Sequence, residues 1–134
     1  MDYGQRLDEW NAVKKGIDGS ETRQSVQAKR IYWMKIGQNI GKEVFGKGAT
    51  FARPVLVINV LFNDTFLGVP LSSKTQGKKG KFYHKFIDSK GNEQLALLGQ
   101  VRIFDIKRIG AYLSKIEGKD FVKIKEKIKG EIVK

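Results

Sequence analysis

The stretch RPVLVINVLFNDTFLGVPLSS, residues Arg53–Ser73, places two apolar runs on either side of a polar pair, Asn63 and Asp64. Runs rich in β-branched and aromatic residues that flank such a pair predict two antiparallel strands joined by a tight turn. Only Asn59 interrupts the first run, so both faces of its strand should be covered. The stretch therefore predicts a hairpin whose first strand is the centre of the core.

Polar residues stand at the ends of this hairpin. The two prolines of the chain, Pro54 and Pro70, suit strand boundaries or edge positions, where no ladder N–H is needed. A cation, Arg53, enters the first strand, and two hydroxyl groups, Ser72 and Ser73, leave the second. We expect these three side chains to converge on one edge of the sheet.

Composition limits the class of protein. The chain has 134 residues, 40% of them hydrophobic, which is enough for one domain with a single core. Its 26 Lys and Arg against 14 Asp and Glu give a net charge of +12, which favours a polyanion such as nucleic acid, or an acidic protein, as partner. Cysteine is absent, and no run is typical of a membrane span or signal peptide, so we expect a soluble, cytoplasmic protein without disulfides or membrane contact.

The flanking segments complete an α+β pattern. Residues Gln5–Ile17 have helical periodicity and precede a flexible connector, so residues 1–28 are predicted to be a helical extension of a main domain at 29–134. Short antiparallel strands with terminal helices predict a small, partly closed β-barrel. Besides the hairpin and a glycine-rich loop at 37–52, the predicted elements are strands at Lys29–Ile36, Phe82–Ile87, Glu93–Leu98, Val101–Phe104 and Ile109–Ile116, and an amphipathic helix at about Gly118–Val133.

The residue types exclude several chemistries. His84 is the only histidine, no serine lies in a GxSxG elbow, and neither zinc-ligand clusters nor a nucleotide fingerprint occur, so no metal or cofactor is expected. What remains is phosphate chemistry without a metal, in which RNA supplies its own 2′-hydroxyl nucleophile. Arg53 suits the stabilisation of phosphoryl charge, because a guanidinium donates two parallel hydrogen bonds; a surface cation on an edge strand is the alternative interpretation.

Three further features admit two interpretations each. Lys74–Lys81, KTQGKKGK, is either a solvated turn or a phosphate-steering loop. Tyr83 is either a packing residue or a platform for an unpaired base. His84 is either a proton-transfer group or a hydrogen-bonded residue on a half-buried face, and its neighbours Phe82 and Phe86 favour the second.

The order of the motifs resembles one family, the MazF/PemK-like toxins of type II toxin–antitoxin systems. The resemblance extends from about Arg30 to the C-terminus, and the helical leader is similar to that of a PemK-like subgroup. The motifs that carry it are RIYWMKIG at 30–37, GKE at 41–43, RPVLVI at 53–58, VPLSSK at 69–74 and GQVRIFDIKRIG at 99–110, followed by the amphipathic helix.

This resemblance implies an SH3-like β-barrel that forms a homodimer and binds a cognate antitoxin protein. It also implies a sequence-specific, metal-independent endoribonuclease that cleaves single-stranded RNA at short sequences to give 2′,3′-cyclic phosphate and 5′-hydroxyl ends. By motif, Arg53 resembles the arginine that stabilises the scissile phosphate, and Ser72 resembles the catalytic hydroxyl residue. The residues expected to bind RNA or to shape the site are Lys42, Glu43, Lys47, Ser73, Lys74, Lys78, Lys79, Lys81, Tyr83, His84, Gln100 and Arg102.

The chain departs from some branches of the family. Leu97 and Gly99 stand where those branches have an arginine and an aspartate, and Lys42 stands where some have a histidine. Proton transfer is therefore left to Lys42, Glu43, Ser72 or water. Three alternatives stay open: a noncatalytic nucleic-acid-binding barrel, a gyrase poison of the same fold, and a structural domain whose lysines are only solvated. The C-terminus lacks the tryptophan motif expected of the gyrase poison.

Overall fold

The structure is a computed structural model that describes Glu9 and residues 25–37 and 52–133. The helix predicted at Gln5–Ile17 and the glycine-rich loop therefore lie almost entirely outside the described residues. The strands and the C-terminal helix occur close to their predicted bounds. The elements are β1 (Arg30–Lys35), β2 (Ala52–Val60), β3 (Thr65–Ser72), β4 (Tyr83–Ile87), β5 (Glu93–Leu97), the short helical turn η1 (Leu98–Gln100), β6 (Arg102–Asp105), the turn η2 (Ile106–Arg108), β7 (Ile109–Lys115), α2 (Gly118–Lys127) and its wider continuation η3 (Ile128–Ile132).

The predicted hairpin is formed by β2 and β3. Asn63 and Asp64 both have positive φ angles, 55° and 56°, and the N–H of Thr65 donates to the carbonyl of Phe62 at 3.3 Å. Two successive left-handed residues are the pattern of a type I′ turn, whose twist matches that of the flanking strands. The polar pair in the sequence thus forms the turn that it predicts.

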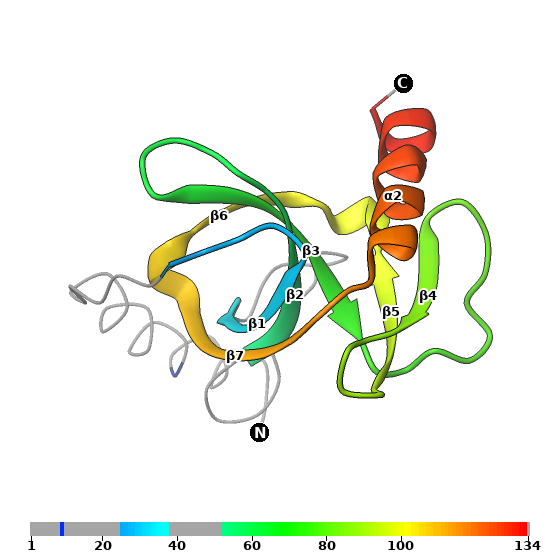
Figure 1. Ribbon diagram of the computed structural model, residues 1–134, viewed down its shortest axis with the longest axis horizontal. Coiled ribbons are helices and arrows are strands. Elements are labelled where there is room, and N and C mark those ends of the chain that lie inside the picture. Colours follow the sequence, from blue (N-terminus) through cyan, green and yellow to red (C-terminus); the bar gives the residue numbers. More distant parts are fainter. Residues whose placement is uncertain (1–8, 10–24, 38–51, 134) are drawn as a thin grey trace.

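All paired strands are antiparallel, and β2 lies in the middle of the sheet. The neighbours run in the order β4, β5, β3, β2, β1 and β7, and β6 pairs with β3 outside this path. Strands β6, β3, β2, β1 and β7 curl around one side of the molecule, while β4, β5 and α2 lie on the other (Figure 1). Within the described residues no ladder joins β6 to β7. The predicted partly closed barrel is therefore confirmed.

Strand β3 belongs to both halves of the sheet. Its first half, Thr65–Gly68, pairs with β6, whereas Leu71 and Ser72 pair with β5. Pro70 lies between the segment of β3 that pairs with β6 and the segment that pairs with β5. Its missing N–H therefore interrupts neither of these two ladders. The change of partner leaves Ser72 at the junction between the barrel and the second hairpin.

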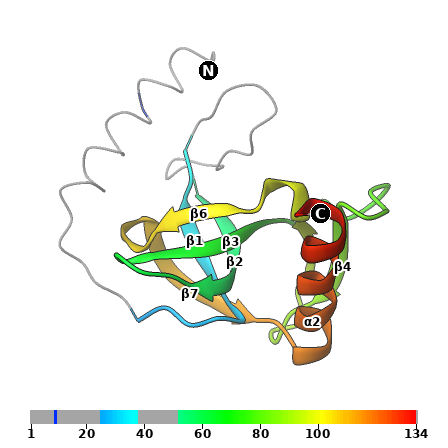
Figure 2. The ribbon, with the colours of Figure 1, turned by 90° about the horizontal axis from the view of Figure 1, so that it is seen from above.

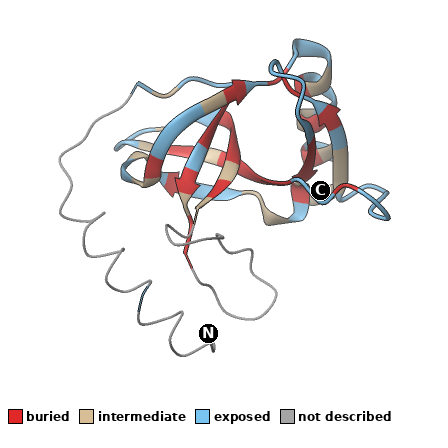
Figure 3. Ribbon diagram, turned by 90° about the horizontal axis from the view of Figure 1, so that it is seen from below, coloured by how far each residue is buried: buried red, intermediate tan, exposed pale blue. Residues whose placement is uncertain are grey.

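The central strand contributes to two hydrophobic clusters, one on each face of the sheet. Val55 and Val57 pack in one cluster, which includes Phe66 and Phe104. Leu56 and Ile58 point the other way, into the cluster that α2 covers. Figure 3 shows how the buried positions follow the strands. Both faces of β2 are covered, as its apolar run predicts.

Close packing in the first cluster depends on a glycine. A Cβ atom at Gly68 would lie 2.7 Å from Cγ1 of Val55 and about as close to the rings of Phe66 and Phe104, at 3.0 and 3.1 Å. All three neighbours are completely or almost completely buried, so they have little room to shift. Because Gly68 has no side chain, β3 can pack closely against the buried side chains of this cluster.

Helix α2 stands beside β4 (Figure 2). Phe121, Ile124 and Ile128 recur at helical spacing and are buried against the second cluster. Two polar contacts fix the helix to β4. Nε2 of His84 lies 3.1 Å from Oδ1 of Asp120, and Nζ of Lys127 donates to the carbonyl of Tyr83 at 3.0 Å.

Candidate functional site

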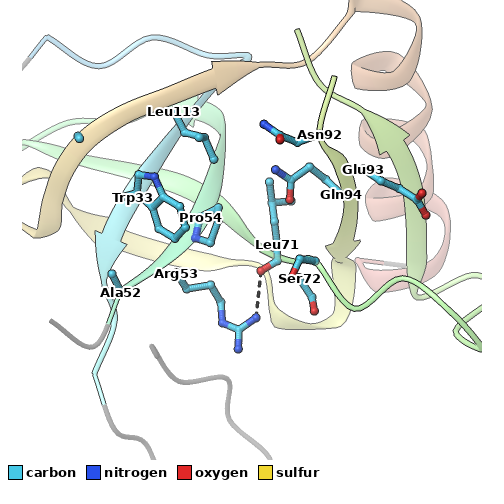
Figure 4. A pocket seen from close by; sticks show the side chains of 12 residues that line it. Trp33, Ala52, Arg53, Pro54, Leu71, Ser72, Asn92, Glu93, Gln94 and Leu113 are labelled. Atoms are coloured by element: carbon cyan, nitrogen blue, oxygen red, sulfur yellow. Dashed lines mark hydrogen bonds between the residues drawn. The ribbon is translucent and has the colours of Figure 1, made fainter. Parts of the chain in front are cut away.

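A pocket of about 720 Å³ opens where the two halves of the sheet meet. One side comes from β1, β2 and β7, and the other from the end of β3 and the start of β5 (Figure 4). The residues that line it are Trp33, Ala52, Arg53, Pro54, Leu71, Ser72, Ser73, Asn92, Glu93, Gln94, Ala111 and Leu113.

Arg53 is the cation of this pocket. It is buried, with 9% of its surface exposed, and Nη1 donates to the carbonyl oxygen of Leu71 at 3.0 Å. Burial lowers the pKa of Arg53, but a guanidinium stays charged at neutral pH because its ordinary pKa is so high. The alternative of a surface cation on an edge strand is wrong, since Arg53 lies in the central strand and faces a pocket.

Ser72 is the buried hydroxyl of the same pocket. Its Oγ accepts a hydrogen bond from the backbone N–H of Lys74 at 3.1 Å, and the residue is 7% exposed. This bond orients the hydroxyl group, whose own proton can be donated to an anion. The expected convergence of Arg53 with Ser72 and Ser73 is present, because all three line one pocket.

The opposite wall is built by the turn between β4 and β5. Asp88 accepts hydrogen bonds from the backbone N–H groups of Lys90 and Asn92, both at 2.9 Å, and from Oγ of Ser114 at 2.8 Å. It also accepts from the side-chain amides of Asn92 and Gln94, both at 3.2 Å. Burial alone would raise the pKa of Asp88, but the hydrogen bonds outweigh it and the pKa is lowered. The carboxyl group of Asp88 is therefore ionised, and it lies behind the pocket wall.

The same turn is attached to β7. The N–H of Ser89 donates to the carbonyl of Lys115 at 2.9 Å, and Oγ of Ser89 accepts from the N–H of Lys115 at 3.0 Å. Together with the bond from Ser114 to Asp88, these contacts hold the β4–β5 hairpin against the barrel. The width of the pocket is thus set by contacts between segments about 26 residues apart in sequence.

The lysine-rich loop begins at the edge of the pocket. It connects β3 to β4, directly after Ser72, and Ser73, Lys74, Lys78, Lys79 and Lys81 are exposed. Lys81 lies 3.8 Å from Glu131, a contact between exposed side chains that contributes little to stability. The loop begins directly after Ser72, and its first residue, Ser73, lines the pocket, whereas none of its lysines does.

Other residues proposed from the sequence lie elsewhere. Tyr83 and His84 contact α2, so the hydrogen-bonded, half-buried interpretation of His84 is confirmed. Gln100 lies in η1, and Arg102 is an exposed residue of β6 whose guanidinium stacks on Phe104 at 4.8 Å; none of these residues borders the pocket. Lys42, Glu43 and Lys47 are outside the described residues.

Several pocket residues carry no clear signal in the sequence. Local patterns do not single out Trp33, Asn92 or Gln94 as site residues, although Asn92 belongs to a segment with obvious turn chemistry. An aspartate followed four residues later by an asparagine is typical of a side-chain-stabilised turn. The pairing of that turn with Ser114 of β7 could not be inferred from the local pattern.

The described part of the chain contains no cluster of three or more His, Asp or Glu side chains that could hold a metal ion. Among the same residues, no helix is long and apolar enough to cross a membrane.

A partly closed antiparallel barrel with a buried arginine and a serine in one pocket defines a small barrel protein whose pocket contains a buried cation and a hydroxyl group. The chain belongs to the family described as PemK-like, MazF-like toxin of type II toxin–antitoxin system, whose model matches residues 27–131. No curated protein matches the sequence.

Solved structures of low sequence identity share the fold. MazF from Deinococcus radiodurans is 18% identical, with a TM-score of 0.66 over 84% of this chain and 100% of that chain. A MazE–MazF complex from the same organism is 15% identical, with a TM-score of 0.61 over 83% and 97% of the two chains. An endoribonuclease in complex with its cognate antitoxin, from a mycobacterial species, is 14% identical, with a TM-score of 0.58 over 81% and 96%. The predicted toxin fold is confirmed by these similarities.

Proposed function

We propose that the chain is the toxin of a type II toxin–antitoxin system and that it is a metal-independent endoribonuclease acting on single-stranded RNA. The observation that supports this most directly is that Arg53 and Ser72 share a pocket at the edge of a lysine-rich loop. Membership of the toxin family supports the same activity, and one of the similar structures is itself described as an endoribonuclease.

The reaction needs little covalent chemistry from the protein. The 2′-hydroxyl oxygen of one nucleotide attacks the adjacent phosphorus and the bond to the 5′-oxygen breaks, leaving a 2′,3′-cyclic phosphate and a 5′-hydroxyl group. Arg53 stabilises the charge on the phosphoryl oxygens, and Ser72 donates a hydrogen bond to one of them. The attacking hydroxyl loses a proton and the leaving oxygen gains one, and these transfers fall to Ser72, Lys42, Glu43 or water.

The lysine-rich loop and the net charge of +12 concentrate RNA at this pocket. The same field attracts an antitoxin with an acidic or amphipathic segment, which would block RNA by occupying the pocket. The similar structures that contain an antitoxin support this part of the proposal. We further propose that the protein acts in the cytoplasm and assembles as a homodimer.

The test is cleavage of a long, end-labelled single-stranded RNA in EDTA, followed by mapping of the product ends. We expect discrete cuts with cyclic phosphate and 5′-hydroxyl ends, which Arg53→Ala and Ser72→Ala abolish or weaken. Lys123→Ala, which removes a positive charge from an exposed position of α2, is the control and should cut normally. RNA that is bound but left intact across varied sequences would favour the noncatalytic nucleic-acid-binding barrel instead.

A further inference from the structure

The pocket wall formed by β5 and its preceding turn presents hydrogen-bond acceptors. Nδ2 of Asn92 and Nε2 of Gln94 each lie 3.2 Å from the same oxygen of Asp88. An ionised carboxylate only accepts hydrogen bonds, so both amides must turn their NH₂ groups toward Asp88. The two amide oxygens are then turned away from Asp88, and both residues line the pocket.

The orientation of these amides is enforced from behind the wall. Ser114 and the backbone N–H of Asn92 also donate to Asp88, and together with the two side-chain amides they lower the pKa of this carboxyl group despite its burial. Asp88 is therefore ionised at neutral pH, which excludes the flipped arrangement of Asn92 and Gln94. The orientation of the Asn92 and Gln94 amides therefore depends on the hydrogen bonds that Asp88 accepts in the folded protein.

The facing side of the pocket is apolar and aromatic. Trp33 of β1 is 40% exposed. It pairs with Pro54 of the central strand β2, whose two faces are otherwise covered. Figure 4 shows Trp33, Pro54 and Leu113 on one side of the pocket and Asn92 and Gln94 on the other. An exposed indole in a pocket that also holds a buried arginine suits stacking on an unpaired base. A pocket of about 720 Å³ is large enough for one nucleotide.

The two ends of the pocket carry different polar groups. Arg53 and Ser72 lie together at one end, where a phosphate is attracted. The side chain of Glu93 points away from this space (Figure 4), and its carboxylate accepts a hydrogen bond from Thr75, so the polar groups at the other end are the neutral amides of Asn92 and Gln94. A nucleotide fits this arrangement with its phosphate at Arg53 and its base between Trp33 and the acceptor wall.

We propose that this pocket reads one unpaired base beside the scissile phosphate, with Trp33 as the stacking platform and the oxygens of Asn92 and Gln94 as acceptors. The inference rests on the proposed function for its RNA substrate. Guanine suits the wall because its edge carries two adjacent donors, the N1–H and the N2 amino group. Uracil suits it least, because its single N–H lies between two carbonyl oxygens. Asp88 is a positioning residue that sets which way the amides face.

Binding of mononucleotides tests the pocket without requiring cleavage. The chain has two tryptophans, so Trp10→Phe leaves Trp33 as the only fluorescent indole. We expect guanosine monophosphate to quench its emission saturably, with a dissociation constant about tenfold lower than that of uridine monophosphate. Gln94→Met in this background removes the amide at similar size and should abolish the preference, whereas Gln27→Met, at an exposed position before β1, should retain it. Equal binding of both nucleotides, or a preference unchanged by Gln94→Met, overturns the inference.

Cleavage of a randomised single-stranded RNA separates this inference from the proposed function. Guanine enriched at one position beside the cut, and lost in Gln94→Met while cutting continues, supports both. Cutting without any guanine preference keeps the endoribonuclease and refutes the base pocket. Selective binding of guanosine monophosphate by a protein that cuts no RNA keeps the pocket and refutes the endoribonuclease. Quenching of Trp33 only by an apolar peptide, and by no nucleotide, would assign the pocket to a protein partner instead.

Discussion

Arg53 donates a hydrogen bond from Nη1 to the carbonyl oxygen of Leu71, at 3.0 Å, and so fixes a buried guanidinium beside the next residue along β3, Ser72. The bond crosses from the start of β2 to the end of β3, two strands that pair throughout the hairpin. It holds a positive charge and a hydroxyl group at one edge of the sheet before any ligand binds. Such preorganisation is what allows fixed donors to stabilise charge in a transition state.

Arg53→Lys is predicted to reduce RNA cleavage by about 100-fold or more, although it conserves the charge. A lysine is a point charge that cannot donate two parallel bonds to a phosphate, and loss of one preorganised donor typically costs a factor of about 100 to 1000. Single-turnover cleavage measures the effect, and circular dichroism checks the fold. Near-normal cleavage by Arg53→Lys would mean that only charge matters at this position.

Removal of two loop lysines, Lys78→Ala with Lys79→Ala, is predicted to weaken RNA binding and make it less dependent on salt. For every phosphate of a single strand that the protein ceases to neutralise, the slope of log K against log salt becomes shallower by about 0.7. Binding titrations at several salt concentrations measure the slope. The control pair, Lys119→Ala with Lys123→Ala, changes the net charge equally on exposed positions of α2. If both pairs change the slope alike, the loop has no special role.

Gly68→Ala is predicted to destabilise the protein by about 1–3 kcal/mol, because the added methyl group overpacks a rigid part of the core. The nearest atom, Cγ1 of Val55, would be 2.7 Å away. Urea denaturation of the variant and the parent measures the loss. Gly99→Ala is the matched control, since apart from the adjacent backbone and the two chain neighbours no atom lies within 4 Å of the added methyl group there. Equal stability of both variants would contradict the tight contact.

Ile124→Ala is predicted to cost about 2–5 kcal/mol, because it leaves a cavity beneath α2. Ile124 is completely buried in the cluster that includes Leu56 and Phe121. Thermal unfolding compares it with Val122→Ala, a truncation on the same helix at a residue that is 50% exposed and should change little. A small effect of Ile124→Ala would show that α2 contributes little to the stability of the barrel.

Asp88 is predicted to make stability sensitive to acid. Its pKa is lower in the folded protein than in the unfolded chain, so the unfolded chain binds more protons as the solution is acidified. The stabilisation is complete above the unfolded pKa of about 4 and is lost as the pH falls through the lower, folded value. Melting temperatures of parent and Asp88→Asn across pH should therefore differ most near neutrality and converge in acid. Glu126→Gln, which removes one carboxylate from an exposed position of α2, is the control for the change in net charge.

Much of the fold is readable from local patterns. The covered central strand, the turn at Asn63 and Asp64 and the amphipathic C-terminal helix follow from residues close together in sequence, because their periodicity and turn chemistry act over a few residues. The meeting of Arg53 with Ser72 is predictable for the same reason, since one hairpin brings both to the same edge.

The second wall of the pocket depended on contacts that no local pattern specifies. Asp88 meets Ser114 across 26 residues, and this contact turns Asn92 and Gln94 into a wall that faces Trp33. The neighbours of His84 in the sequence favoured a hydrogen-bonded, half-buried role, but they could not identify its partner, Asp120 of α2, which is 36 residues away. The sequence by itself determined the strands, the helix and the pair Arg53 and Ser72, because neighbouring residues dictate them. Only the tertiary structure decided which other side chains face that pair, because strand partners and loop docking depend on the packing of the whole chain.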